Sequence, residues 1–247
     1  MDWKKKVQGW LTRITPTEKM DQQDRAALLM SLEGSNTGDR WRAAQALGAA
    51  DPGREGVAAL SAVLSSADPI LCWEAAQALA QIRTPAAEAA LLNAVSTGNI
   101  GAKTAAIDAL GTMAASPDTL AALLGALENR SASVRQSAAE AVARLATQPA
   151  AEGVPSPGPE TAAALLDLLQ SDDAPLVRRA AALALGHLGD PVARDALEAS
   201  QADDREDPLV RKAAGEALGR LHRLELVQET TLPDSSVEQP VEEVGEA

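Results

Sequence analysis

The chain has 247 residues, of which 46% are hydrophobic, but it contains neither phenylalanine nor tyrosine and is rich in alanine. Small, unbranched side chains favour helices and leave few residues suited to strands, so the composition excludes a sheet protein. The net charge of −13 argues against nucleic-acid binding, and the lone Cys72 excludes an internal disulfide and favours a reducing, cytoplasmic location.

Residues 1–14 predict a short amphipathic helix. Five apolar residues at helical spacing share one face, whereas the cations lie elsewhere. The apolar residues are Trp3, Val7, Trp10, Leu11 and Ile14, and the cations are Lys4, Lys5, Lys6 and Arg13. No apolar run in the chain is long enough to cross a membrane, and the first residues lack a signal-peptide pattern, so membrane insertion is not expected.

A degenerate tract, clearest at residues 177–186, recurs six times and predicts a helical repeat array over residues 15–223. Its penultimate apolar residue, which we call the anchor, falls at Leu47, Leu79, Leu110, Val142, Leu185 and Leu218. The steps between anchors are 32, 31, 32, 43 and 33 residues. A unit of this length cannot bury its own apolar face, so the units must stack into a solenoid of about six helical hairpins.

Each unit reads as a first helix, a short turn and a second helix that carries the tract. Expected first helices cover residues 56–65, 86–95, 118–128, 160–170 and 192–199, and residues 70–82 form a typical second helix. Asp-Pro pairs end one helix and begin the next, and Gly48, Gly111, Gly186 and Gly219 are expected to end helices. The long step contains four prolines between residues 147 and 160, which predicts a loop that is either a tolerated insertion or a binding loop.

Residues 224–247 contain seven carboxylates and no lysine or arginine. An acidic segment without sustained apolar periodicity predicts a disordered tail. Leu224, Leu226 and Val227 are the residues that extend the last helix if it continues into this tail.

Three stretches within residues 176–191 resemble the HEAT-like repeat of phycobilisome lyases. They are Leu176-Val177-Arg178-Arg179-Ala180-Ala181, Ala184-Leu185-Gly186 and Leu188-Gly189-Asp190-Pro191, and the resemblance extends over residues 17–222. It implies a right-handed superhelix whose second helices line the concave wall. It also implies structural ion pairs between the tract arginine and the preceding turn, namely Arg178 with Asp173 and Arg211 with Asp207.

The resembling family includes bilin lyases, a di-iron deoxyhypusine hydroxylase and adaptors. The hydroxylase holds iron with His-Glu pairs after the Val-Arg pair of selected repeats, and only Glu74 matches that pattern here. The two histidines, His187 and His222, are expected near helix ends in different repeats, so no metal and no cofactor are predicted. No nucleophile motif or phosphate-binding loop is present either, which favours a non-catalytic scaffold.

The predicted partner-binding surface is the concave face. Its candidate residues are Trp41, Gln45, Trp73, Gln77, Lys103, Ile107, Arg179, Leu183 and Lys212. Equivalent tryptophans in adjacent repeats predict an aromatic ridge, which is either a protein-binding groove or a surface that Trp3 and Trp10 cover as a cap. A third interpretation places residues 1–14 on an anionic membrane surface. A bilin lyase-like or chaperone-like role on a pigment protein is the alternative, with Lys103, Arg179 and Lys212 facing bilin propionates.

Overall fold

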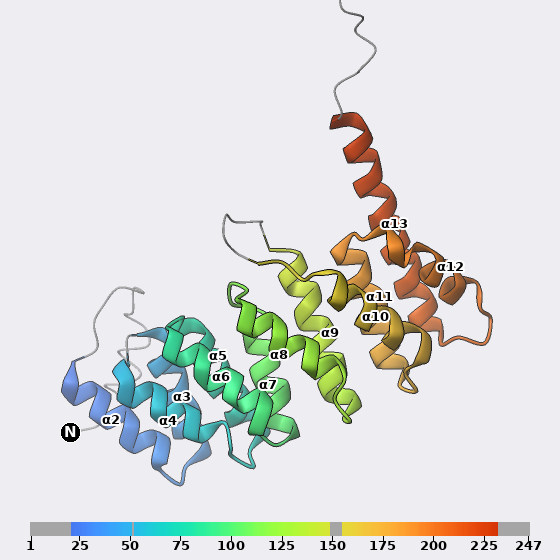
Figure 1. Ribbon diagram of the computed structural model, residues 1–247. Coiled ribbons are helices and arrows are strands. Elements are labelled where there is room, and N and C mark those ends of the chain that lie inside the picture. The colour runs from blue at the N-terminus through green and yellow to red at the C-terminus, as the bar shows by residue number, and fades with distance from the viewer. Residues whose placement is uncertain (1–20, 51, 149–154, 232–247) are drawn as a thin grey trace, which may run out of the picture.

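The structure, a computed structural model, describes residues 21–50, 52–148 and 155–231. These residues form twelve α-helices and one short 3-10 helix, with no strand among them (Figure 1). Consecutive helices pair into hairpins, and the hairpins stack in chain order. The predicted all-α superhelical repeat fold is therefore confirmed.

The described residues form six hairpins, which we number as repeats 1 to 6. They are α2 (Gln22–Glu33) with α3 (Thr37–Ala49), α4 (Gly53–Val63) with α5 (Pro69–Ile82), α6 (Pro85–Thr97) with α7 (Ile100–Leu110), α8 (Pro117–Leu127) with α9 (Ala132–Ala146), α10 (Pro159–Ser171) with α11 (Pro175–Leu188), and α12 (Arg194–Ala202) with α13 (Pro208–Thr231). A 3-10 helix η1 (Pro191–Ala193) leads into α12. The helix bounds follow the sequence-based expectation closely.

Proline and capping residues begin many of these helices. Pro69 and Pro117 occupy the first helical position, where the missing amide hydrogen costs no hydrogen bond. Asp68 precedes Pro69 and its side chain accepts a hydrogen bond from the amide of Ile70 at 3.0 Å. Ser116 caps α8 in the same way. Local sequence thus sets where each hairpin turns.

The anchors form the centre of the core. Five of them have at most 1% of their surface exposed: Leu47, Leu79, Leu110, Val142 and Leu185. Leu218 of repeat 6 is only partly buried, because no further hairpin follows it within the described residues. Burial of each anchor therefore depends on the neighbouring repeat, as the stacking argument predicts.

The second helices approach one another more closely than the first helices do. Ideal Cβ atoms built on Gly48 and Gly186 would lie 2.6 Å from the Cα atoms of Ala78 and Ala217, each in the next second helix. The first helices make few contacts with each other. The layer with the shorter spacing lies on the inside of a curved stack, so the second helices line the concave wall. Of the four glycines expected to end helices, Gly111 does so as the C-cap of α7. Gly48, Gly186 and Gly219 lie inside α3, α11 and α13, so the expectation is wrong for these three.

The ends of the array differ from the expected boundaries in one respect. Helix α13 continues to Thr231, so residues 224–231 belong to the last helix and not to the tail, and Figure 1 shows this helix projecting past its neighbours. The predicted cap at residues 1–14 and the tail from residue 232 lie outside the described residues. In the predicted loop, residues 155–158 are non-helical and 149–154 lie outside the description. No described helix meets the length and hydropathy needed to cross a membrane.

Candidate functional site

The concave wall consists of one exposed stripe on each second helix. On α5 the stripe is Ile70, Trp73, Gln77 and Gln81, which are spaced three or four residues apart. Relative to the anchor, these positions are nine, six and two residues before it and two residues after it. The same four positions in the other repeats define what the wall presents to a ligand.

Trp41 and Trp73 stand six residues before the anchors of repeats 1 and 2. Their side chains are 37% and 48% exposed, on the adjacent and closely packed helices α3 and α5. Gln45 is exposed and Gln77 half-buried, each one turn further along the same face. Adjacent helices pack about 8–10 Å apart, so two indoles and two amides share one surface. This part of the wall has rigid apolar groups beside hydrogen-bond donors and acceptors.

Two residues assigned to this surface in repeat 3 do not belong to it. Ile107 is fully buried, and Lys103 Nζ donates to the carbonyl oxygens of Val95 and Ser96 at 2.7 and 2.8 Å. Counting back from Leu110 by six and two residues gives Thr104 and Asp108 instead. The prediction was wrong by one residue, because a shift of one position rotates a side chain by about 100° around a helix.

The wall becomes charged toward repeats 4 to 6. Arg179 and Leu183 are half-buried on α11, whereas Lys212 is exposed and lies 3.9 Å from Glu216. Arg144 of α9 pairs with Asp108 of α7 at 2.9 Å. Burial raises the pKa of Asp108, although its hydrogen bond with Arg144 opposes that shift. The structure therefore divides the predicted surface into an aromatic and amide part and a charged part.

His187 shares the charged part with Arg220. Burial lowers the pKa of His187, and the positive charge of Arg220 lowers it further. His187 lies in the last turn of α11, near a helix end as expected. His222 lies inside α13, well before Thr231, so the same expectation is wrong for that residue. Neither residue stands in a cluster of three or more metal-ligating side chains, and the described residues contain no such cluster.

The position seven residues before each anchor is occupied by a hydrogen-bond donor in every repeat. These residues are Arg40, Cys72, Lys103, Arg135, Arg178 and Arg211. Each donates to backbone carbonyls at or just beyond the end of the first helix of its own hairpin, for example Arg40 Nε to Leu32 at 2.9 Å and Arg178 Nη1 to Asp172 at 2.6 Å. Such donors satisfy carbonyls that a helix end leaves without partners.

The acidic partners of these arginines differ from the expected ones. Arg178 pairs with Glu206 of the next repeat through two hydrogen bonds of 2.9 and 2.6 Å, not with Asp173. Arg211 lies 3.2 Å from Asp204, and Asp207 accepts from the amide of Leu209 instead. Both predicted pairs are wrong. Arg178 pairs with a carboxylate in the turn of the following hairpin, whereas Arg211 pairs with a different carboxylate in the turn of its own hairpin.

Cys72 is a donor of this set and not a reactive thiol. Its side chain is 1% exposed, with Sγ 3.1 Å from the carbonyl oxygen of Ser66. Burial raises its pKa, and the nearby charge of Asp68 adds to that shift. A protonated, buried thiol reacts slowly.

We therefore expect iodoacetamide at pH 7.5 to leave native Cys72 unmodified over a period in which the unfolded chain reacts completely. Intact-mass spectrometry gives the number of labels per chain. A Ser65→Cys variant, which places a thiol on an exposed position, should gain one label while folded. Complete labelling of the native parent protein would show that the thiol is accessible.

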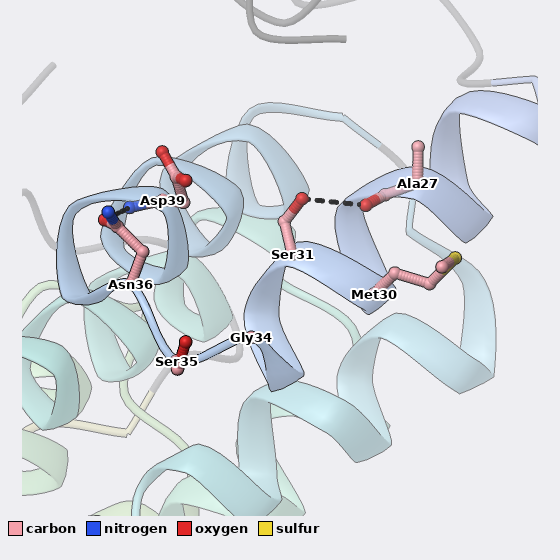
Figure 2. Close-up of a pocket in the computed structure, with 7 residues that line it drawn as sticks. All are labelled: Ala27, Met30, Ser31, Gly34, Ser35, Asn36 and Asp39. Carbon is pink, nitrogen blue, oxygen red and sulfur yellow. Dashed lines mark hydrogen bonds between the residues drawn. The ribbon is translucent and has the colours of Figure 1, made fainter.

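A cavity lies between the C-terminal half of α2 and the start of α3. Figure 2 shows residues that line it: Ala27, Met30 and Ser31 of α2, Gly34 and Asn36 of the turn, and Asp39 of α3. Its volume is about 470 Å³, and Met30 at its edge is 74% exposed. The sequence does not reveal this site, because its residues form no chemical motif and are brought together only by the packing of α2 against α3.

Comparison with known proteins places these features in a family. A family model described as HEAT repeats matches residues 25–111 and 150–219, which is more than half of the chain. The chain belongs to the HEAT repeat family. Repeat 4 lies mainly between the two matched stretches, but its hairpin of α8 and α9 has the same form. This HEAT repeat protein matches no curated protein.

Three solved structures illustrate the similarity. The complex of CpcE and CpcF of phycocyanin lyase from Nostoc sp. PCC7120 is 26% identical, with a TM-score of 0.54 over 66% of this chain and 98% of that chain. An engineered protein is 21% identical, with a TM-score of 0.54 over 83% and 100%. A designed armadillo repeat protein in complex with the peptide (KR)4 is 16% identical, with a TM-score of 0.52 over 79% and 98%. The last two show the fold alone.

Proposed function

We propose that this HEAT repeat protein is a non-catalytic scaffold whose concave wall binds a segment of a partner protein. The observation that carries the proposal is the exposed pair Trp41 and Trp73 at equivalent positions of adjacent repeats. Contact between the exposed indoles and water is unfavourable in the free protein, and tryptophans that become buried supply much of the binding free energy of protein interfaces. A partner that covers both rings gains that energy.

Gln45 and Gln77 give the same surface a polar component. Each amide has donors and an acceptor and stands one helical turn from a tryptophan. A peptide lying across α3 and α5 can therefore pair its backbone with the amides while its apolar or cationic side chains rest on the indoles. The designed armadillo repeat protein, which has a similar fold, is in complex with the peptide (KR)4, so a solenoid of this kind can bind a peptide.

The charged part of the wall contributes selectivity in this proposal. Arg179, Lys212 and Glu216 lie on α11 and α13, beyond the tryptophans along the stack. Exposed charges add little affinity but discriminate against partners of the wrong charge pattern. The favoured partner is a segment with apolar or basic residues at one end and mixed charges at the other.

The test is a crosslinking pull-down of the full-length protein with a double variant, Trp41→Ala with Trp73→Ala. We expect the variant to remain folded by circular dichroism and to lose at least tenfold in affinity for partners that the parent protein recovers. The reason is that truncating one buried tryptophan at the centre of an interface costs about 2 kcal/mol or more of binding free energy. Isothermal titration calorimetry with each recovered partner measures the loss.

The control is the double variant Leu176→Ala with Leu209→Ala. It removes exposed apolar side chains from the same face in repeats 5 and 6, where they are 52% and 55% exposed. We expect it to bind like the parent protein. If the Trp41→Ala, Trp73→Ala variant binds the recovered partners as tightly as the parent protein does, the proposal is overturned.

A role in pigment attachment is a second candidate, favoured by the 26% identity to the phycocyanin lyase complex. In that role the cations of the charged part, Arg179 and Lys212, face the propionates of a bilin. The distinguishing measurement is the visible absorption spectrum of the protein after incubation with a free bilin and gel filtration. Co-elution of colour with the protein supports the second candidate, and a colourless protein fraction removes it.

A further inference from the structure

The face of repeat 1 that points away from the array has a different character from the corresponding faces of the other repeats. Gly48, one residue after its anchor, meets Ala78, one residue before the next anchor. The residue before each anchor therefore faces the preceding repeat. The residue eight before the anchor lies on the same side of the helix, since seven residues make two turns.

The position eight residues before the anchor is apolar and buried in repeats 2 to 6. It holds Leu71, Ala102, Val134, Val177 and Val210, each at most 1% exposed. In repeat 1 it holds Asp39, whose carboxylate is bonded to Arg42 at 2.9 Å. Asp39 also lines the cavity between α2 and α3. The sequence of repeat 1 is thus not suited to another hairpin of the same kind, but the face still contains a cavity with apolar Ala27 and Met30 at its edge (Figure 2).

We propose that residues 1–14 of the same chain dock on this end face and place an indole, from Trp3 or Trp10, in the cavity. The volume of about 470 Å³ is within the range of about 300–1,000 Å³ that encloses small ring systems in proteins. Capping of an exposed terminal repeat is a general requirement of solenoids. The cap rests on the end face and not on the Trp41 and Trp73 surface, which stays open for a partner.

Chain length makes the intramolecular arrangement feasible. Residues 15–20 connect the segment to Asp21, and six residues span up to about 20 Å. A helix of residues 2–14 is about 20 Å long, and α2 is about 18 Å long. The segment can therefore lie along α2 and reach the cavity near Met30.

Apolar pattern and charge also fit this occupant. The apolar stripe of residues 2–14 matches an end face that exposes Met30, and its flanking Lys4, Lys5 and Lys6 meet a cavity lined by the carboxylate of Asp39. The array is acidic as a whole, so a cationic segment is attracted to it. This inference goes beyond the scaffold role and does not depend on it.

The test uses the tryptophans of the segment as reporters. In a full-length Trp41→Phe, Trp73→Phe background, Trp3 and Trp10 are the remaining tryptophans. We expect their fluorescence to be blue-shifted and several-fold less quenched by iodide than in a free peptide of residues 1–20. An additional Ala27→Glu change, which puts a charged side chain in the cavity, should return the emission and quenching to the values of the peptide.

The matched control is Ala62→Glu, at an exposed position of α4 away from the cavity, and it should leave the protected emission unchanged. Emission and quenching equal to those of the free peptide in the parent background would overturn the proposal. If Trp3 and Trp10 are protected from iodide only at concentrations where analytical ultracentrifugation shows dimers, the cavity binds the segment of a second copy. If they are protected only when anionic vesicles are present, the segment binds a membrane surface. Either result overturns intramolecular docking and leaves the concave-wall proposal unaffected.

Discussion

An Asp172→Asn variant is expected to lose about 3 kcal/mol of unfolding free energy. The carboxylate of Asp172 accepts two hydrogen bonds from Arg135, at 2.6 and 2.9 Å, and a third from the amide of Ala174 at 2.9 Å. The side chains of Asp172 and Arg135 are only 2% and 17% exposed. Removing one charge leaves a largely buried guanidinium without its counterion, which costs about 3–5 kcal/mol in comparable sites.

This ion pair joins repeat 4 to repeat 5. Arg135 belongs to α9 and Asp172 follows α10, so the pair spans the long step that contains the proline-rich loop. Urea unfolding monitored by circular dichroism measures the loss. The control is Asp173→Asn, one residue further on and exposed, which should change stability by less than about 0.5 kcal/mol. Equal losses in the two variants would show that Asp172 has no special role.

The same pair predicts how stability depends on pH. Burial by itself raises the pKa of Asp172, but its bonds with Arg135 and the Ala174 amide hold that pKa below its usual range. The unfolded chain then binds more protons than the native one as acid is added, so stability is full above a pH of about 4 and falls below it. The difference between the parent protein and Asp172→Asn should shrink as the pH falls from 7 toward 3.

A Gly186→Ala variant is expected to destabilise the array by about 2 kcal/mol, although alanine is the better helix former. An ideal Cβ at Gly186 lies 2.6 Å from both Cα and Cβ of Ala217, so α11 and α13 must move apart to admit the methyl group. Such overpacking costs about 1–3 kcal/mol in tightly packed cores. Thermal and urea unfolding of the full-length protein both measure the loss.

Gly125→Ala gives the matched control with the opposite expected sign. Gly125 lies within α8, and an added Cβ meets no atom within 4 Å. This variant should gain about 1 kcal/mol from helix propensity alone. Stabilisation by both substitutions would show that the second helices can separate without cost, and it would contradict the close-packing account of the concave wall.

Local signals in the sequence predicted the helices well. Pro69 and Pro208 mark helix starts, and Asp68 is a side-chain cap, because these effects depend on residues within one turn of each other. The last helix was predicted less well, since α13 continues through Leu226 to Thr231. Arg194 of α12 pairs with Glu225 on this extension. That contact joins residues distant in sequence, so no local pattern predicts it.

The candidate surface was predicted only in part. Trp41 and Trp73 are exposed on the concave wall, whereas Lys103 and Ile107 of repeat 3 are not part of it. A repeat alignment gives the spacing of units, but a surface assignment requires the rotation of each side chain about its helix. An error of one residue changes that rotation by about 100°, which is enough to turn a surface residue into a core residue.

The sequence by itself determined the all-α repeat architecture, the number of hairpins and the residues that anchor the core. These follow from periodic burial of apolar side chains, which composition and spacing encode directly. Only the tertiary structure decided the partners of Arg135 and Arg178, the close approach at Gly186 and the cavity at Met30. The physical reason is that each of these depends on distances between side chains of different helices or repeats, and a one-dimensional pattern contains no such distance.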